Sequence, residues 1–219
     1  MKIARNKEEL SALYKDVAVL NVKEEECFWW VEILKNGVVY MDKVYKPIPW
    51  NYVAMFMAER GFPPRILKDL KHLRETEIIQ TVKSINGHKG IILSGPAGVG
   101  KTFALSLKIA NKLRNYRVKN PVYISLPDLQ DFKSTKELVA ESDVVFLDDV
   151  KGSLRESLLD FVHTVIYHCY NHEKLLYIAT NLSWKDLINV LQEQPIVSRL
   201  SEMCVYKRIE GKDLRLSRR

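Results

Sequence analysis

A glycine-rich stretch near the middle of the chain has the residue types and spacing that bind phosphate groups. It matches the pattern G-x-x-x-x-G-K-T and consists of Gly95, Pro96, Ala97, Gly98, Val99, Gly100, Lys101 and Thr102. Glycines let consecutive backbone N–H groups point at a phosphate, and a following helix adds its positive end. Lys101 supplies a cation to the β- and γ-phosphates, and the Thr102 hydroxyl is a ligand for Mg²⁺. The stretch therefore predicts a site for ATP, or a closely related nucleoside triphosphate, with Mg²⁺.

Two adjacent carboxylates, Asp148 and Asp149, follow an apolar run further along the chain. At the end of a strand beside the glycine-rich stretch, Asp148 would hold the water shell of the Mg²⁺ ion. Asp149 is placed to polarise the water that attacks the γ-phosphate. The alternative for Asp149 is that it caps a helix that begins after Val150.

A polar pair, Thr180 and Asn181, follows the next apolar run. Its side chains can hydrogen-bond the γ-phosphate or the attacking water. The alternative is that the pair caps the helix predicted from Trp184, a role that Ser183 could equally fill.

The elements that must position these side chains follow an alternating pattern from Lys89 onward. Five short apolar runs predict strands, and two of the segments between them, around residues 103–113 and 155–171, carry apolar residues at helical spacing. The runs are Gly90–Ser94, Pro121–Ser125, Val144–Leu147, Leu175–Ala179 and Val205–Ile209. Continuous apolar strands separated by helices predict an α/β fold with a parallel sheet that helices cover on both faces.

The first sixty residues have a different pattern. Asn6–Leu20 reads as a capped helix, and Trp50–Arg60 as a second helix. Between them, Asn36-Gly37 separates two aromatic and β-branched runs, which is a strong signal for a β-hairpin. Gly61-Phe62-Pro63-Pro64 then ends the second helix. We therefore expect a small α+β domain over residues 1–60 and an ATPase domain over residues 61–219.

The charge of the chain is uneven. The net charge is +7, and residues 1–60 carry nine basic and nine acidic side chains, so the whole excess lies in residues 61–219. A basic surface suits phosphate-rich partners such as nucleic acid, and the alternative is an ordinary solvated surface rich in Lys and Glu. The sequence has neither a signal-peptide pattern nor a long apolar run, which predicts a cytoplasmic protein without a membrane span.

The later motifs, taken in order, resemble the DnaC-like helicase loaders and the related IstB-type transposition helper ATPases of the AAA+ superfamily. The resemblance starts at Gly61-Phe62-Pro63-Pro64-Arg65 and runs to the C-terminus. Val145–Val150 resembles the second nucleotide motif of this family, and Ala179–Ser183 resembles its sensor strand, with Asn181 as the sensor. Val197–Cys204 is similar to the arginine-finger box, and Gly211–Arg215 to the closing motif.

This resemblance implies an AAA+ P-loop ATPase without a C-terminal lid domain. Arg199 would reach the site of a neighbouring subunit, because a guanidinium offsets charge on the transferring phosphoryl group. The chain would therefore form a homo-oligomer, and the alternative for Arg199 is a surface ion pair. The implied partners are a replicative hexameric helicase, docked on residues 1–60, and single-stranded DNA.

A DNA contact would depend on basic side chains outside the nucleotide site. Related proteins carry an additional DNA-holding helix where this chain has only the short segment 126–142. Two basic clusters remain as candidates: Lys112, Arg114, Arg117 and Lys119, and Lys207, Arg208, Lys212, Arg215, Arg218 and Arg219. A transposition helper, a small-molecule P-loop kinase and a nucleotide-gated module with little turnover are the alternative functions.

Overall fold

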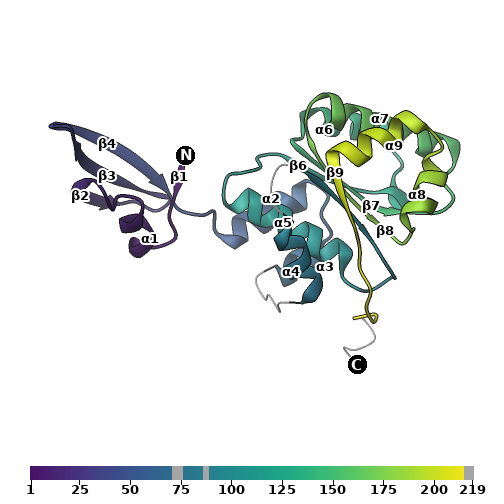
Figure 1. The fold of residues 1–219 in the computed structure, drawn as a ribbon, viewed down its shortest axis with the longest axis horizontal. Helices are drawn as coiled ribbons and strands as arrows, with labels where there is room; N and C mark the ends of the chain where they lie inside the picture. Colours follow the sequence, from purple (N-terminus) through teal and green to yellow (C-terminus); the bar gives the residue numbers. More distant parts are fainter. Residues whose placement is uncertain (71–75, 86–88, 215–219) are drawn as a thin grey trace.

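The computed structural model describes residues 1–70, 76–85 and 89–214, and Figure 1 shows a small unit beside a larger one. The larger unit contains a five-stranded sheet whose order is β6-β7-β8-β5-β9. Every pair of neighbouring strands in it is parallel. Its strands are β5 (Gly90–Ser94), β6 (Pro121–Ser125), β7 (Val144–Val150), β8 (Leu175–Thr180) and β9 (Cys204–Arg208). The predicted parallel sheet is therefore confirmed.

Helices cover both faces of this sheet (Figure 1). One face carries α2 (Trp50–Glu59), α3 (Pro64–Asp69), α4 (Glu77–Ser84) and α5 (Lys101–Arg114). The other face carries α6 (Phe132–Glu141), α7 (Glu156–Asn171), α8 (Trp184–Leu191) and α9 (Gln194–Met203). The alternation within β5 shows why this inner strand carries apolar residues on both faces: Ile91 and Leu93 belong to the first core and Ile92 to the second.

The small unit is a four-stranded sheet with the order β1-β4-β3-β2. Its strands are β1 (Lys2–Ile3), β2 (Ala18–Glu24), β3 (Phe28–Lys35) and β4 (Val38–Tyr45). The predicted hairpin joins β3 to β4, and Asn36 and Gly37 have φ angles of 53° and 75°. Such positive angles at both central residues match the right-handed twist of the two strands.

The first predicted helix is too long. The helix α1 covers only Lys7–Ala12, where the Asn6 side chain accepts a hydrogen bond from the Glu9 amide at 2.8 Å. Residues from Ala18 onward instead form β2, which pairs with β3 along its length. The reason is tertiary: Leu10 and Tyr14 are buried against the sheet, while Leu13 is exposed.

The linker between the two units contacts the end of α5. The Ile48 amide donates to the Arg114 carbonyl at 2.9 Å, and the Tyr116 hydroxyl donates to the Lys46 carbonyl at 3.1 Å. The helix α2 packs Val53 and Met57 into the core of the larger unit. The division into residues 1–60 and 61–219 stays a proposal. That boundary places α2 in the small unit, whereas α2 packs on the larger unit.

The short segment 126–142 contains the 3-10 turn η1 (Leu126–Asp128) and the helix α6. Asp131 caps α6, because its side chain accepts a hydrogen bond from the Ser134 amide at 3.0 Å. Across the described parts of the chain, every helix falls short of the length and apolar character needed to span a bilayer.

Candidate nucleotide-binding site

The glycine-rich stretch forms the turn between β5 and α5, as the sequence predicts. Gly98 and Gly100 have φ angles of 77° and 99°, which only glycine adopts readily. The Gly95 amide donates to the Thr180 carbonyl at 3.2 Å, which fixes the start of the turn against β8. The turn lies at the carboxyl ends of the parallel strands, where open α/β sheets bind ligands.

The Lys101 ammonium group lies inside this turn. It donates to the carbonyls of Gly95 and Pro96 at 2.8 and 2.7 Å, and to the Asn181 side-chain oxygen at 2.8 Å. Although it is charged, Lys101 is only 8% exposed. These oxygen atoms hold the Lys101 ammonium group at the first turn of α5, and the N-terminus of a helix is a site that favours anions.

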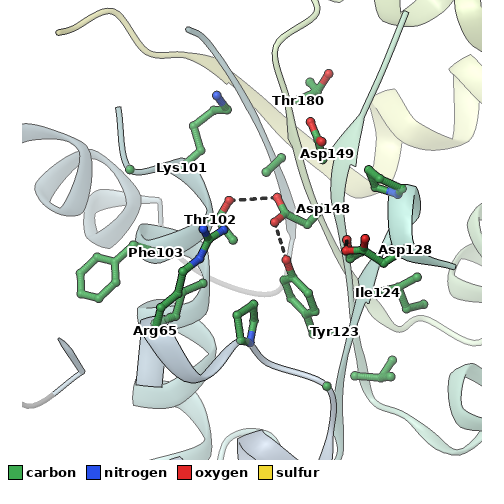
Figure 2. A pocket seen from close by; sticks show the side chains of 18 of the residues that line it. Arg65, Lys101, Thr102, Phe103, Tyr123, Ile124, Asp128, Asp148, Asp149 and Thr180 are labelled. Atoms are coloured by element: carbon green, nitrogen blue, oxygen red, sulfur yellow. Dashed lines mark hydrogen bonds between the residues drawn. The ribbon is translucent and has the colours of Figure 1, made fainter. Parts of the chain in front are cut away.

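Asp148 faces the same turn from the end of β7 (Figure 2). One carboxylate oxygen accepts a hydrogen bond from Thr102 Oγ1 at 3.0 Å, and the other accepts one from the Tyr123 hydroxyl at 2.5 Å. Burial raises the pKa of Asp148 above its usual range, whereas the hydrogen bonds from Tyr123 and Thr102 oppose that rise. Burial and the adjacent Asp148 carboxylate raise the pKa of Tyr123, so its hydroxyl stays protonated and donates.

The residues present suit a magnesium ion. Hard oxygen donors are the ligands that Mg²⁺ prefers, and it is commonly held by one or two carboxylates together with phosphates. The Thr102 hydroxyl and the Asp148 carboxylate are such donors, and both line a cleft of about 2180 Å³. Their direct contact at 3.0 Å brings the two proposed ligands to one point at the mouth of the glycine-rich turn.

Asp149 has a left-handed backbone with φ at 61°, next to an irregularity in the pairing of β7 with β8. This conformation is uncommon outside glycine, and it turns the Asp149 side chain into the cleft. The Asp149 carboxylate lies 3.3 Å from the Lys151 ammonium group. Because α7 begins only at Glu156, the alternative that Asp149 caps a helix after Val150 is wrong.

Asn181 extends from the end of β8 and is exposed beside the Lys101 ammonium group. Thr180 is buried, and its hydroxyl donates to the Val150 carbonyl at 2.7 Å. The cap of α8 is Ser183, whose side chain accepts from the Asp186 amide. The alternative role of Thr180 and Asn181 as a helix cap is therefore filled by Ser183.

The C-terminal segment lies along the glycine-rich turn. The Ile209 amide donates to the Ser94 carbonyl at 2.7 Å, and the Leu214 amide donates to the Gly98 carbonyl at 3.1 Å. A Cβ atom on Gly98 would lie 1.9 Å from an Asp213 carboxylate oxygen, so the two segments are in close contact. Arg215, the last residue of the predicted closing motif, lies outside the described residues.

Arg199 is on α9 and does not belong to the described lining of the cleft. Its guanidinium carbon lies 4.4 Å from the centre of the Tyr167 ring and 5.3 Å from that of Tyr170. One guanidinium nitrogen donates to the Pro195 carbonyl at 2.9 Å. Within its own subunit, Arg199 is thus held against the aromatic side chains of α7, away from the glycine-rich turn.

The first basic cluster suggested for DNA contact is partly used within the fold. Arg114 donates from Nε to the Ile48 carbonyl at 3.1 Å, and its guanidinium lies over the Trp50 ring. Lys119 and Arg117 are exposed. In the second cluster, Arg215, Arg218 and Arg219 lie outside the described residues.

Two side chains of the cleft were not predicted as functional residues. Tyr123 sits within an apolar strand, and the only sequence signal was a hydroxyl group that needs a partner when buried. Arg65 extends from α3 into the cleft, with its guanidinium beside Thr102 in Figure 2. Its sequence signal was its place in the segment that resembles the one preceding the nucleotide site in helicase loaders.

No protein-family model matches the chain, and no curated protein sequence matches it. Among solved structures, the crystal structure of the DnaC helicase loader is 24% identical with a TM-score of 0.54, over 67% of this chain and 99% of that chain. The DnaI structure is 20% identical with a TM-score of 0.52, over 69% of this chain and 93% of the DnaI chain. The replication initiator DnaA bound to AMPPCP and single-stranded DNA is 20% identical with a TM-score of 0.51, over 69% of this chain and 51% of the DnaA chain. Over about two thirds of its length, the chain therefore has the fold of these helicase-loader and initiator structures.

Proposed function

We propose that this chain binds and hydrolyses ATP with Mg²⁺ and acts as a DnaC-like loader of a replicative helicase. The observation that carries the ATPase proposal is the position of the Lys101 ammonium group, 2.8 Å from Gly95 O and from the Asn181 side-chain oxygen. Thr102 and Asp148 would hold Mg²⁺, which would offset charge on the β- and γ-phosphates.

Three side chains of this protein have separate roles in the proposed hydrolysis. Asp149 polarises the attacking water, because its carboxylate faces the cleft beside Asp148. Asn181 hydrogen-bonds the γ-phosphate or that water from the end of β8. Arg199 supplies positive charge to the site of a neighbouring copy, since its guanidinium lies against α7, away from the cleft of its own subunit. The proposed active form is consequently a homo-oligomer.

The loader role is supported by the fold shared with DnaC and DnaI and by the surface of the small unit. Large apolar side chains are exposed around the tip of its β3–β4 hairpin: Leu34, Val38, Val39, Tyr40 and Met41. Exposed apolar side chains gathered in one place mark sites of contact with other proteins. We assign this hairpin tip to the docking of the helicase, and the exposed basic residues of the larger unit to single-stranded DNA.

Co-purification separates the loader from its nearest alternative. Tagged protein should retain a replicative helicase and release a transposase, and both this retention and the ATPase activity should increase when ATP and Mg²⁺ are present. A transposase retained in place of the helicase would assign the chain to the transposition helpers. ADP formation that needs an added nucleoside or sugar would indicate a kinase. ATP binding with negligible turnover, even with helicase and DNA, would indicate a nucleotide-gated module.

A further inference from the structure

We infer that Tyr123 is a positioning residue for the magnesium ligand Asp148 and connects that ligand to the turn between α2 and α3. The inference rests on the proposed Mg²⁺-dependent nucleotide site. It concerns a residue that takes part in neither phosphate binding nor hydrolysis.

The first step is the hydrogen bonding of Asp148. This carboxylate is 8% exposed and each of its oxygens accepts one hydroxyl hydrogen, from Thr102 on one side and Tyr123 on the other. Donors on both oxygens fix the rotation of the carboxylate plane. Groups that orient a metal ligand in this way are commonly worth a large part of the metal affinity.

The second step is the strand geometry. Tyr123 pairs with Phe146 in the register of β6 and β7, and Asp148 follows Phe146 by two residues on the same face of the sheet. The Tyr123 ring lies edge-on to Phe146, with ring centres 5.2 Å apart. The hydroxyl therefore reaches forward along β7 to Asp148, as Figure 2 shows.

The third step is the contact with the α2–α3 turn. The Tyr123 amide donates to the Arg60 carbonyl at 3.0 Å, and the Phe62 ring lies 5.3 Å from the Tyr123 ring. Gly61 has a φ of 87°, and a Cβ atom on it would lie 2.9 Å from the Tyr123 carbonyl oxygen. The backbone and the ring of Tyr123 are thus both held by residues 60–62, which follow directly on α2.

A displacement of α2 would accordingly move Tyr123 and loosen Asp148. The linker that precedes α2 is itself hydrogen-bonded to the end of α5, at Arg114 and Tyr116.

The test measures binding of a fluorescent ATP analogue by the full chain, first in EDTA and then across a Mg²⁺ titration. Tyr123→Phe should bind as the wild type does in EDTA, whereas its Mg²⁺ midpoint should rise roughly tenfold. The matched control is Tyr177→Phe, which removes a buried hydroxyl that has no hydrogen-bond partner among the described residues. The control should keep the wild-type Mg²⁺ midpoint.

Three outcomes would overturn the inference. An unchanged Mg²⁺ midpoint in Tyr123→Phe would show that the hydroxyl does not orient Asp148, and the proposed ATPase would stand. Weakening by the same factor in EDTA and in Mg²⁺ would show general damage to the fold. Wild-type binding that is insensitive to Mg²⁺ would remove both the inference and the proposed metal site.

The contact with the turn is tested by Phe62→Leu, which keeps an apolar side chain but loses the ring. This variant should also raise the Mg²⁺ midpoint, and it should add little in the Tyr123→Phe background, because the two changes act through one hydrogen bond. Fully additive effects would separate Phe62 from the metal site and overturn the connection to α2.

Discussion

The ammonium nitrogen of Lys101 lies 2.8 Å from the side-chain oxygen of Asn181, which joins the first turn of α5 to the end of β8. The two residues are brought together by the parallel pairing of β5 with β8, which aligns Ser94 with Thr180. A residue proposed to bind phosphate and one proposed to sense it are therefore in direct contact. Substitutions at the two positions should affect nucleotide binding jointly.

Lys101→Ala should weaken ATP binding by at least roughly tenfold, because a charge-assisted contact to phosphate is lost. Adding Asn181→Ala to this variant should have less effect than Asn181→Ala has alone. Equilibrium binding of a fluorescent ATP analogue measures both changes. The matched control, Lys136→Ala, removes an exposed lysine on α6 and should bind as the wild type does. Undiminished ATP affinity in Lys101→Ala would refute the proposed nucleotide site.

Asp149→Asn should retain ATP binding and lose turnover by roughly 10² to 10⁴-fold, the range of general base catalysis. The amide keeps the size of the side chain but cannot accept a proton from water. Steady-state ATPase rates with saturating ATP measure the loss. Asp160→Asn, an exposed position on α7, is the control and should keep the wild-type rate. If Asp149→Asn hydrolysed ATP at full rate, another group would have to polarise the water.

Arg199→Ala should bind ATP normally and lose turnover by roughly 10³-fold or more, as expected for an arginine finger. Because Arg199 would act on a neighbouring copy, mixtures of wild-type and variant subunits should give a curved dependence of the ATPase rate on composition. Lys185→Ala, an exposed change on α8, should give no loss. A straight mixing line would contradict action between subunits.

Gly98→Ala and Gly37→Ala separate steric contact from backbone strain. Both positions have positive φ, but a Cβ atom at Gly37 meets nothing within 4 Å, whereas one at Gly98 meets the Asp213 carboxylate at 1.9 Å. Gly37→Ala should lower the free energy of unfolding by about 1 kcal/mol and leave ATP binding intact. Gly98→Ala should impair ATP binding as well. Thermal unfolding and nucleotide titration of both variants measure the difference, and equal behaviour would argue against a role for this contact.

The parallel sheet could be predicted from the sequence because its three inner strands, β5, β7 and β8, are apolar runs buried on both faces. The strand β2 could not, because all seven of its residues are exposed and its apolar residues do not mark a buried face. Its conformation depends on pairing with β3, a contact between segments that the local pattern does not encode. The helix α6 was not predicted either, because only Val139 among its ten residues is buried and the sequence therefore shows no apolar stripe.

The side chains of the candidate site show a similar division. Lys101, Thr102 and Asp148 were predicted together because the turn and the strand ends are local patterns with known chemistry. The contact of Tyr123 with Asp148 depends on β6 lying beside β7, and this strand order is a property of the whole sheet. The stacking of Arg199 on Tyr167 and Tyr170 likewise requires the packing of α9 on α7.

The turn at residues 60–62 also protects an edge of the sheet. β6 is the outermost strand on its side, and an outermost strand exposes backbone groups that invite pairing with another chain. Here Pro121 has no N–H to offer, and the Tyr123 N–H is already bonded to the Arg60 carbonyl. The edge of β6 is therefore a poor template for pairing between the sheets of two copies, which is a route to aggregates.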